Sequence, residues 1–301
     1  MDFMEIPQES RGQSCGEKRV MNSLNRNNLL RYLNRCRTPK GGYCYFWDPE
    51  SGAGFPNGAD TCWALAAYRS LGSDPPFLSG TCRWLRNELD QNGPMRISPY
   101  LFWFLEGLRL ARAPFSSEDH LCLLRETERL LDDWTTPSDI PFLFEDLAPL
   151  LFLRGRAHLP LSEKEKSRLK ELLEMEAGLP RPFPLPELRT RLFLMEESGR
   201  FSKEMIAKEQ SLERDYRDPL FGYVLVPGSS RSDLFVLRSG LLMRKDPLIP
   251  FEIQVLEDLI LLCQSREGGF GPVGGAVPTL EATSVALELT VLLSHFRHPT
   301  R

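Results

Sequence analysis

Residues 268–287 read GGFGPVGGAVPTLEATSVAL, a glycine-rich turn that leads into a helix of small residues. The same plan occurs near the start of the chain, where residues 41–65 read GGYCYFWDPESGAGFPNGADTCWAL. In both segments a threonine is followed three and four residues later by alanine and leucine, and a cysteine precedes the turn at Cys36 and at Cys263. The first and last parts of the chain are therefore copies of one building block.

The composition is that of an ordinary globular protein. The 301 residues are 42% hydrophobic and 26% charged, with a net charge of −4. Such a chain has no basic surface field for nucleic acid, and no apolar run approaches the roughly 18 residues that a membrane helix needs. Seven cysteines without a Cys-x-x-Cys motif fit a reducing compartment. We expect a cytoplasmic protein with no nucleic-acid partner and no transmembrane segment.

Helical patterns alternate with Gly/Pro turns along the chain, and strand-like alternation is nearly absent. Residues 1–26 are polar and aperiodic, and we expect a tail or a strap over the domain formed by residues 27–301. Six pairs of helices are predicted, at 28–37 and 60–71, 77–89 and 98–111, 117–132 and 139–153, 162–177 and 186–197, 202–216 and 232–244, and 250–263 and 279–296. Matched points on the second helices lie 40 to 49 residues apart, which is typical of a helical array.

The two helices of a pair differ in character. First helices such as 162–177 have one apolar stripe and a charged face, with Ser162 and Glu165 spaced as a capping box, and we expect them outside. Second helices such as 279–293 are apolar almost all round and should be buried inside. Because the first and last units are the most alike, whereas open solenoids end in atypical caps, we predict an all-α fold: an α/α toroid of six pairs.

These residues resemble the prenyltransferase and squalene-cyclase repeat family, which contains the protein prenyltransferase β subunits and the terpenoid cyclases. The resemblance is specific at 29–71 and 263–287 and otherwise rests on spacing. It implies an inner ring of helices around an aromatic-lined cavity for an isoprenoid. It also implies a zinc site, because Asp60-Thr61-Cys62-Trp63 has the family's Asp-x-Cys-aromatic form.

The implied zinc site differs from the family's in two ways. The motif stands in the first unit instead of a late one, and no histidine begins an inner helix, so Glu281 would complete the ligands Asp60 and Cys62. The alternative interpretation is structural: Asp60 caps its helix and Cys62 fills the core. The Asp-x-Asp-Asp acid of the cyclases is absent from the sequence.

The ligand is expected to be an allylic diphosphate. If all inner helices run the same way, their amino ends form one mouth that favours anions, where Arg96 and Arg231 would bind phosphate. Four aromatic residues would contact the isoprenoid: Tyr43, Trp63, Tyr100 and Trp103. The alternatives are solvent-facing arginines and rings that simply fill the centre.

We therefore expect a prenyltransferase-like protein that transfers an isoprenoid to an unknown acceptor, and the resemblance implies a helical partner subunit. A non-catalytic toroid that serves as a scaffold or interaction module is the alternative. A carbohydrate-active α/α enzyme is a third hypothesis, which would need two carboxylates that face each other across the opening of the toroid.

Overall fold

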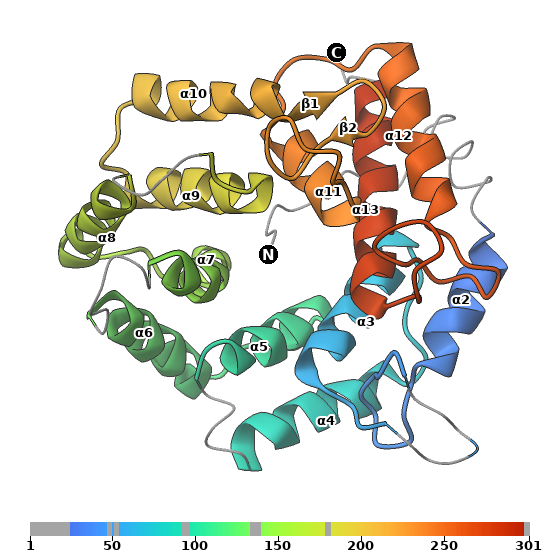
Figure 1. The fold of residues 1–301 in the computed structure, drawn as a ribbon. Helices are drawn as coiled ribbons and strands as arrows, with labels where there is room; N and C mark the ends of the chain where they lie inside the picture. The colour runs from blue at the N-terminus through green and yellow to red at the C-terminus, as the bar shows by residue number, and fades with distance from the viewer. Residues whose placement is uncertain are drawn as a thin grey trace.

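Helices make up almost all of the regular structure, and the all-α prediction is confirmed. The computed structural model describes residues 25–46, 50, 54–91, 97–132, 140–177 and 182–297. Each predicted helical segment is found as a helix, with bounds that differ by a few residues (Figure 1). The α-helices are α2 (Arg26–Arg35), α3 (Gly58–Ser70), α4 (Leu78–Gln91), α5 (Tyr100–Leu110), α6 (Ser117–Asp132), α7 (Ile140–Arg156), α8 (Glu163–Glu176), α9 (Leu185–Ser198), α10 (Lys203–Ser211), α11 (Leu234–Met243), α12 (Pro250–Leu262) and α13 (Leu280–Arg297).

The predicted helix 202–216 is divided between α10 and the 3-10 helix η3 (Leu212–Tyr216). The loop that follows contains an antiparallel hairpin of β1 (Arg217–Asp218) and β2 (Gly222–Tyr223), which was not predicted. The predicted N-terminal strap lies outside the described residues, except for its last two. Asn25 caps α2 by accepting a hydrogen bond from the backbone N–H of Asn28, so these two residues belong to the first helix.

Side-chain caps explain where several helices begin. Ser162 accepts the N–H of Glu165 at 3.3 Å, and the Glu165 carboxylate accepts the Ser162 N–H at 2.7 Å, which confirms the predicted capping box. Asp233 similarly accepts two backbone N–H groups of α11, both at 2.9 Å. These caps satisfy donors that an α-helix leaves free in its first turn.

The second helices of the six pairs contact one another in a closed circuit. Helix α3 packs on α5, which packs on α7, and the contacts continue through α9 and α11 to α13, which lies along α3 again. Figure 1 shows the first helices, α2 and the even-numbered α4 to α12, outside this circuit. The packing of α13 on α3 thus joins the last unit to the first.

The first and last units share their hydrogen bonds as well as their sequence. The Tyr43 N–H donates to the Thr61 hydroxyl at 2.9 Å, and the Phe270 N–H donates to the Thr283 hydroxyl at 3.0 Å. Each threonine in turn donates to the carbonyl oxygen four residues earlier, at 2.8 Å in the first unit and 2.6 Å in the last. The threonine of the repeated motif therefore ties each turn to the helix that follows it.

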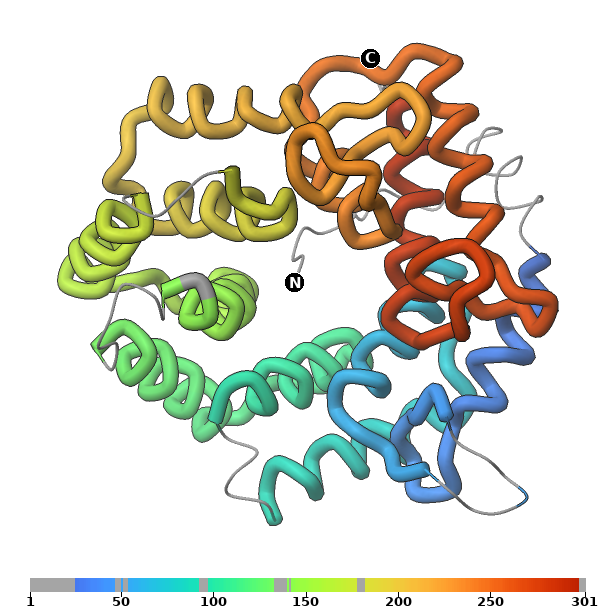
Figure 2. Tube along the Cα trace, viewed as in Figure 1, coloured from blue at the N-terminus to red at the C-terminus, as the bar shows by residue number. Residues whose placement is uncertain are grey.

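The glycine turns connect each of these units to the next one. Gly41 has a φ of +110°, and a Cβ atom built there would lie 2.9 Å from the carbonyl oxygen of Gly80 in α4. Gly268 has a φ of +105°, and its Cβ would lie 2.4 Å from the carbonyl carbon of Asn28 in α2. Figure 2 shows the turn before α13 beside α2. The last unit thus docks on the first as the first docks on the second.

The hydrophobic core consists of two clusters that meet at α3. Ala64 and Tyr68 belong to the cluster formed with α2, α9, α11, α12 and α13, whereas Cys62 and Leu65 belong to the cluster formed with α4 to α9. Trp63 packs against both clusters. Burial on opposite sides explains why α3 is apolar around most of its circumference, as predicted for an inner helix.

The inner helices are not parallel all the way round. In Figure 1 helix α7 is seen end-on, whereas α5 and α9 are seen along their length. These three helices therefore do not run in one direction. At the N-termini of α3 and α13, the side chains of Asp60 and Glu281 lie close enough to interact electrostatically. Within the described ranges, none of the helices combines the length and the apolar character needed to cross a bilayer.

Candidate functional site

A pocket of about 470 Å³ lies between α7, α9, α10 and α11. Its apolar walls include Phe152 of α7, Leu192 and Phe193 of α9, and Met243 of α11. Binding pockets for small ligands typically measure about 300–1,000 Å³ and combine apolar walls with a few polar groups. The polar groups here are Arg156, Arg189, Thr190, Glu196, Glu197 and Gln210.

The regular geometry of α9 places its charged residues at the pocket. Arg189, Phe193 and Glu196 follow one another at spacings of four and three, which puts them on one face of a helix. Pro186 stands in the first turn, and Gly199 ends the helix with a φ of +59°, the left-handed conformation common at helix ends. The sequence therefore fixes both the length of α9 and the face that it presents.

Arg189 is the most buried charged residue in the pocket, with 7% of its surface exposed. Burial lowers the pKa of its guanidinium to about 9, and the like charge of Arg238 on α11 adds to this effect. Arg238 forms an ion pair of 2.6 Å with Glu288 on α13. Three neighbouring inner helices thus bring two arginines and one carboxylate together beside the pocket.

The glutamates of the pocket are more exposed than Arg189. Glu196 and Glu197 lie at the end of α9 and have exposed side chains. Arg156, at the end of α7, has its guanidinium 5.0 Å from the centroid of the Phe152 ring. The pocket is therefore cationic where it is most buried and anionic where it is most exposed.

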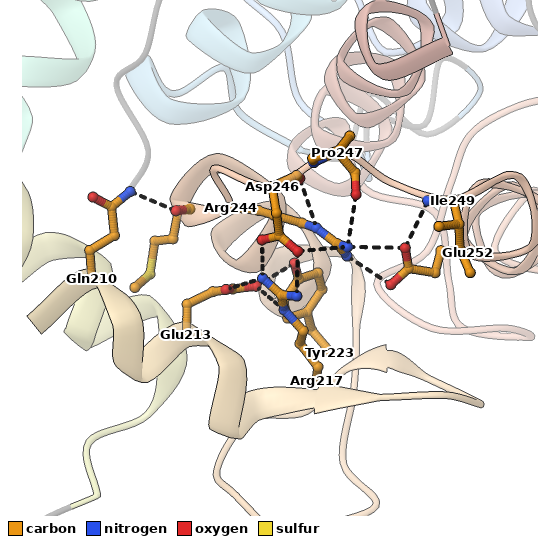
Figure 3. Close-up of polar contacts among 10 residues, drawn as sticks. Gln210, Glu213, Arg217, Tyr223, Arg244, Asp246, Pro247, Ile249 and Glu252 are labelled. Atoms are coloured by element: carbon orange, nitrogen blue, oxygen red, sulfur yellow. Dashed lines mark hydrogen bonds and ion pairs between the residues drawn. The ribbon is translucent and has the colours of Figure 1, made fainter. Parts of the chain in front are cut away.

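A second polar cluster joins η3, the hairpin and the loop after α11 (Figure 3). The Arg217 guanidinium donates to both carboxylate oxygens of Glu213, at 2.8 and 2.6 Å, and of Asp246, at 2.8 and 2.5 Å. The Tyr223 hydroxyl also donates to Glu213, at 2.6 Å, and Arg244 donates to both oxygens of the Glu252 carboxylate. Because these donors and acceptors satisfy one another, we interpret the cluster as a structural clamp.

The three predicted zinc ligands do not converge. Asp60 is nearly buried, and its carboxylate accepts hydrogen bonds from the Asn57 amide at 2.8 Å and from the Tyr45 N–H at 3.3 Å. Burial raises the pKa of both Asp60 and Glu281. Among the residues that the structure describes, no three His, Cys, Asp or Glu side chains are grouped as metal ligands would be.

Cys62 lies on another side of α3. Residues two apart in a helix do not face each other, and the charged groups that act on Cys62 are Glu106 and Arg109 of α5. Burial raises the pKa of its thiol well above the ordinary value. The described surroundings thus favour an inert core thiol at this position.

The four predicted aromatic ligands occupy different environments. Tyr43 is fully buried, with its ring 6.2 Å from that of Tyr68, so it offers no surface to a ligand. Trp63 and Trp103 pack on each other with ring centroids 5.4 Å apart, as expected for rings that fill space between α3 and α5. Tyr100 is 50% exposed at the start of α5. None of the four lines the pocket, whose rings are Phe152 and Phe193.

Of the two predicted phosphate ligands, Arg231 is exposed in the loop before α11 and does not line the pocket, and Arg96 lies outside the described residues. The arginines at the pocket were missed, although the sequence carried a signal for them. Arg189, Arg238 and Glu288 are charged residues on inner helices, where a buried charge requires a partner or a function.

Comparison with models of known protein families and with curated proteins finds no match to this chain.

Proposed function

We propose that this protein binds an isoprenoid diphosphate in the pocket between α7, α9, α10 and α11 and acts as a prenyltransferase-like protein. The observation that carries the proposal is the combination of a 470 Å³ volume, apolar walls and two arginines. An isoprenoid is a branched apolar chain with an anionic head, so it matches both the walls and the cations. The resemblance of the first and last units to prenyltransferases points to the same ligand class.

The charges beside the pocket favour an anion at its buried end. Arg189 and Arg238 act on each other as like charges, and burial disfavours the charged form of Arg189. A phosphate in the pocket beside Arg189 would favour the charged form of its guanidinium and accept charge-assisted hydrogen bonds from it. The exposed Glu196 and Glu197 would repel a diphosphate from the opening, so the head group is expected to bind inside, near Arg189.

The transfer step remains part of the proposal, and the resemblance implies a zinc ion for it. Among the described residues Asp60, Cys62 and Glu281 are not grouped as metal ligands, so these three residues do not fit the ion and no step is assigned to it. Elemental analysis of the purified protein tests for this ion, and a zinc content near zero after purification without chelators would remove the metal from the proposal.

Gly155 provides a direct test of binding. It lines the pocket on α7, and a Cβ built there would meet no heavy atom within 4 Å. A Gly155→Phe substitution therefore fills part of the pocket without overlapping the backbone. Gly80 on α4 is the matched control, because its Cβ would also meet nothing within 4 Å and it lies away from the pocket.

Calorimetric titration with farnesyl and geranylgeranyl diphosphate should show micromolar binding to the natural protein and to Gly80→Phe. For Gly155→Phe we expect binding at least about tenfold weaker, with an unchanged melting temperature. No binding to the natural protein at micromolar ligand would refute the proposal. Equal affinity in all three proteins would place the ligand elsewhere.

A non-catalytic scaffold is the second candidate. Its support is the packing of Trp63 on Trp103 and the burial of Tyr43, since these rings fill the core instead of lining a cavity. A scaffold predicts that neither isoprenoid diphosphate changes the melting temperature at any concentration, whereas specific binding raises it by mass action.

A further inference from the structure

Helix α10 is held more weakly than the other outer helices. Each of α2, α4, α6, α8 and α12 buries at least three residues, whereas α10 buries none. Its Met205 is 52% exposed, and Ile206, the residue of α10 that packs against the two core clusters, is only partly buried. Segments with so few buried apolar contacts open at a low cost in free energy.

Two polar contacts hold the other partly buried residues of α10. The Gln210 amide donates to the carbonyl oxygen of Met243, the last residue of α11, at 2.7 Å. The Glu209 carboxylate accepts a hydrogen bond from the guanidinium of Arg191 on α9 at 3.1 Å. Arg191 also forms an ion pair with the buried Glu176 of α8, so its charge stays paired if α10 moves. Release of α10 therefore breaks both contacts without leaving this buried cation alone.

The backbone changes conformation at both ends of α10. Before the helix, Gly199 has a φ of +59°, and a Cβ atom built there would meet nothing within 4 Å, so the chain has room to turn. After it, the chain continues as the 3-10 helix η3 from Leu212, and such transitions often mark hinges. The end of η3 is anchored, because the Tyr216 hydroxyl donates to the Phe183 carbonyl oxygen at 2.5 Å. Helix α10 is thus a short segment between two points at which the chain can bend.

Helix α10 also forms one wall of the pocket between α7, α9, α10 and α11. Gln210 lines this pocket, as does Met243, which is 4% exposed and whose carbonyl oxygen Gln210 binds. The contact that holds α10 on α11 therefore lies at the pocket itself. Figure 1 shows α10 outside α9, at the periphery of the molecule. An outward movement of α10 would widen the pocket on that side.

We propose that α10 is a movable wall, which swings outward to admit a ligand to the pocket and returns to hold it. The inference uses the pocket of the proposed function but not the identity of its ligand. On opening, Ile206 becomes exposed, and Glu209 and Gln210 exchange their protein partners for water. A helix of nine residues is marginal on its own in water, so α10 should unfold when it leaves. Covers of binding sites are drawn from the least stable parts of a fold for this reason.

Hydrogen exchange measured by mass spectrometry tests the opening. The hydrogen-bonded amides of α10 should exchange at least about tenfold faster than those of α12. Gln210→Ala should raise the exchange rate in α10 about two- to tenfold, the factor that one hydrogen bond of ordinary net strength contributes. The matched control is Gln254→Ala on α12, whose amide donates to Asp258 of the same helix at 2.9 Å. It should leave exchange in α10 unchanged.

Alkylation of a thiol in the pocket tests whether this opening gives access to it. Met243→Cys places a thiol at a buried position beside α10, and its reaction with iodoacetamide is followed by mass spectrometry at position 243. Gln210→Ala, added to this variant, should raise the rate by the same factor as in hydrogen exchange. The natural Cys62 on α3, which is 3% exposed, is the internal control and should react at an unchanged rate.

Exchange in α10 that is as slow as in α12 would refute the proposal. So would alkylation at position 243 that Gln210→Ala leaves unchanged, because α10 would then move without opening the pocket. The exchange experiment needs only the natural protein and single surface variants, so it decides the matter even if Met243→Cys does not fold. Neither measurement uses an isoprenoid, and both are therefore independent of whether farnesyl diphosphate binds.

Discussion

Replacing Gly268 by alanine tests whether the last unit closes on the first. Gly268 stands in the turn before α13 with a φ of +105°, a conformation that residues with a Cβ rarely adopt. The added methyl group would also lie 2.4 Å from the carbonyl carbon of Asn28 in α2. Because that atom belongs to the backbone of a helix, it cannot move away as a flexible side chain could.

Two costs follow from this geometry. The strained backbone costs about 1–3 kcal/mol, and forcing an extra methyl group into a packed contact costs about 1–3 kcal/mol more. We therefore expect Gly268→Ala to lower the free energy of unfolding by about 2–6 kcal/mol. Gly199, at the end of α9, has a φ of +59° but open space around its Cβ, so Gly199→Ala should cost only about 1 kcal/mol.

Urea denaturation followed by circular dichroism measures both variants, and their difference contains the contact with α2 together with the greater backbone strain at Gly268. The reasoning is refuted if the two alanine variants lose the same stability, because the contact with α2 would then contribute nothing. A Gly41→Ala variant provides a further comparison. Its Cβ would lie 2.9 Å from the carbonyl oxygen of Gly80, so its loss should approach that of Gly268→Ala.

Three further predictions concern single polar side chains. Burial raises the pKa of Asp60 above its ordinary value of 3.8, so ionisation of this carboxyl destabilises the folded state as the pH rises. The free energy of unfolding of Asp60→Asn, relative to that of the natural protein, should therefore increase from pH 3 to pH 7 in urea titrations. A difference that does not change with pH would contradict this prediction. Glu213→Gln should cost about 2–4 kcal/mol in the same assay, since this buried carboxylate accepts hydrogen bonds from two side chains, whereas the exposed Glu163→Gln should leave the free energy of unfolding nearly unchanged. Thr283→Val leaves the Phe270 N–H buried without its acceptor and should cost about 1–3 kcal/mol, measured by thermal denaturation; an unchanged melting temperature would show that the bond is not needed.

The helices could be predicted closely because local signals determine where they begin and end. The capping box at Ser162 and the glycine after α9 are read directly from neighbouring residues. The apolar character of the second helices likewise predicted their burial, since Leu234, Leu280 and their neighbours are buried. Each of these signals depends on residues fewer than five positions apart.

The pocket could not be predicted in this way because its residues come from four helices that are distant in the sequence. Phe152, Phe193 and Met243 are brought together by the crossing angles of α7, α9 and α11. Crossing angles follow from how side chains interdigitate between helices, and a period of 40 to 49 residues does not contain that information. The same limit applies to the direction of the inner helices, because the repeat period does not determine whether α5, α7 and α9 run parallel.

Asp60 shows how comparing the first unit with the last separates structural residues from functional ones. Its carboxylate accepts from the Tyr45 N–H and from the Asn57 side-chain amide. In the last unit the position of Tyr45 is held by Pro272, which has no N–H, and that of Asn57 by a threonine with no amide. Both donors are absent there, and the acceptor is absent too, because Ala282 replaces the aspartate. The aspartate therefore occurs only where its two donors occur, so the fold accounts for this carboxylate without a metal ion, as the structural interpretation of the Asp-x-Cys motif requires.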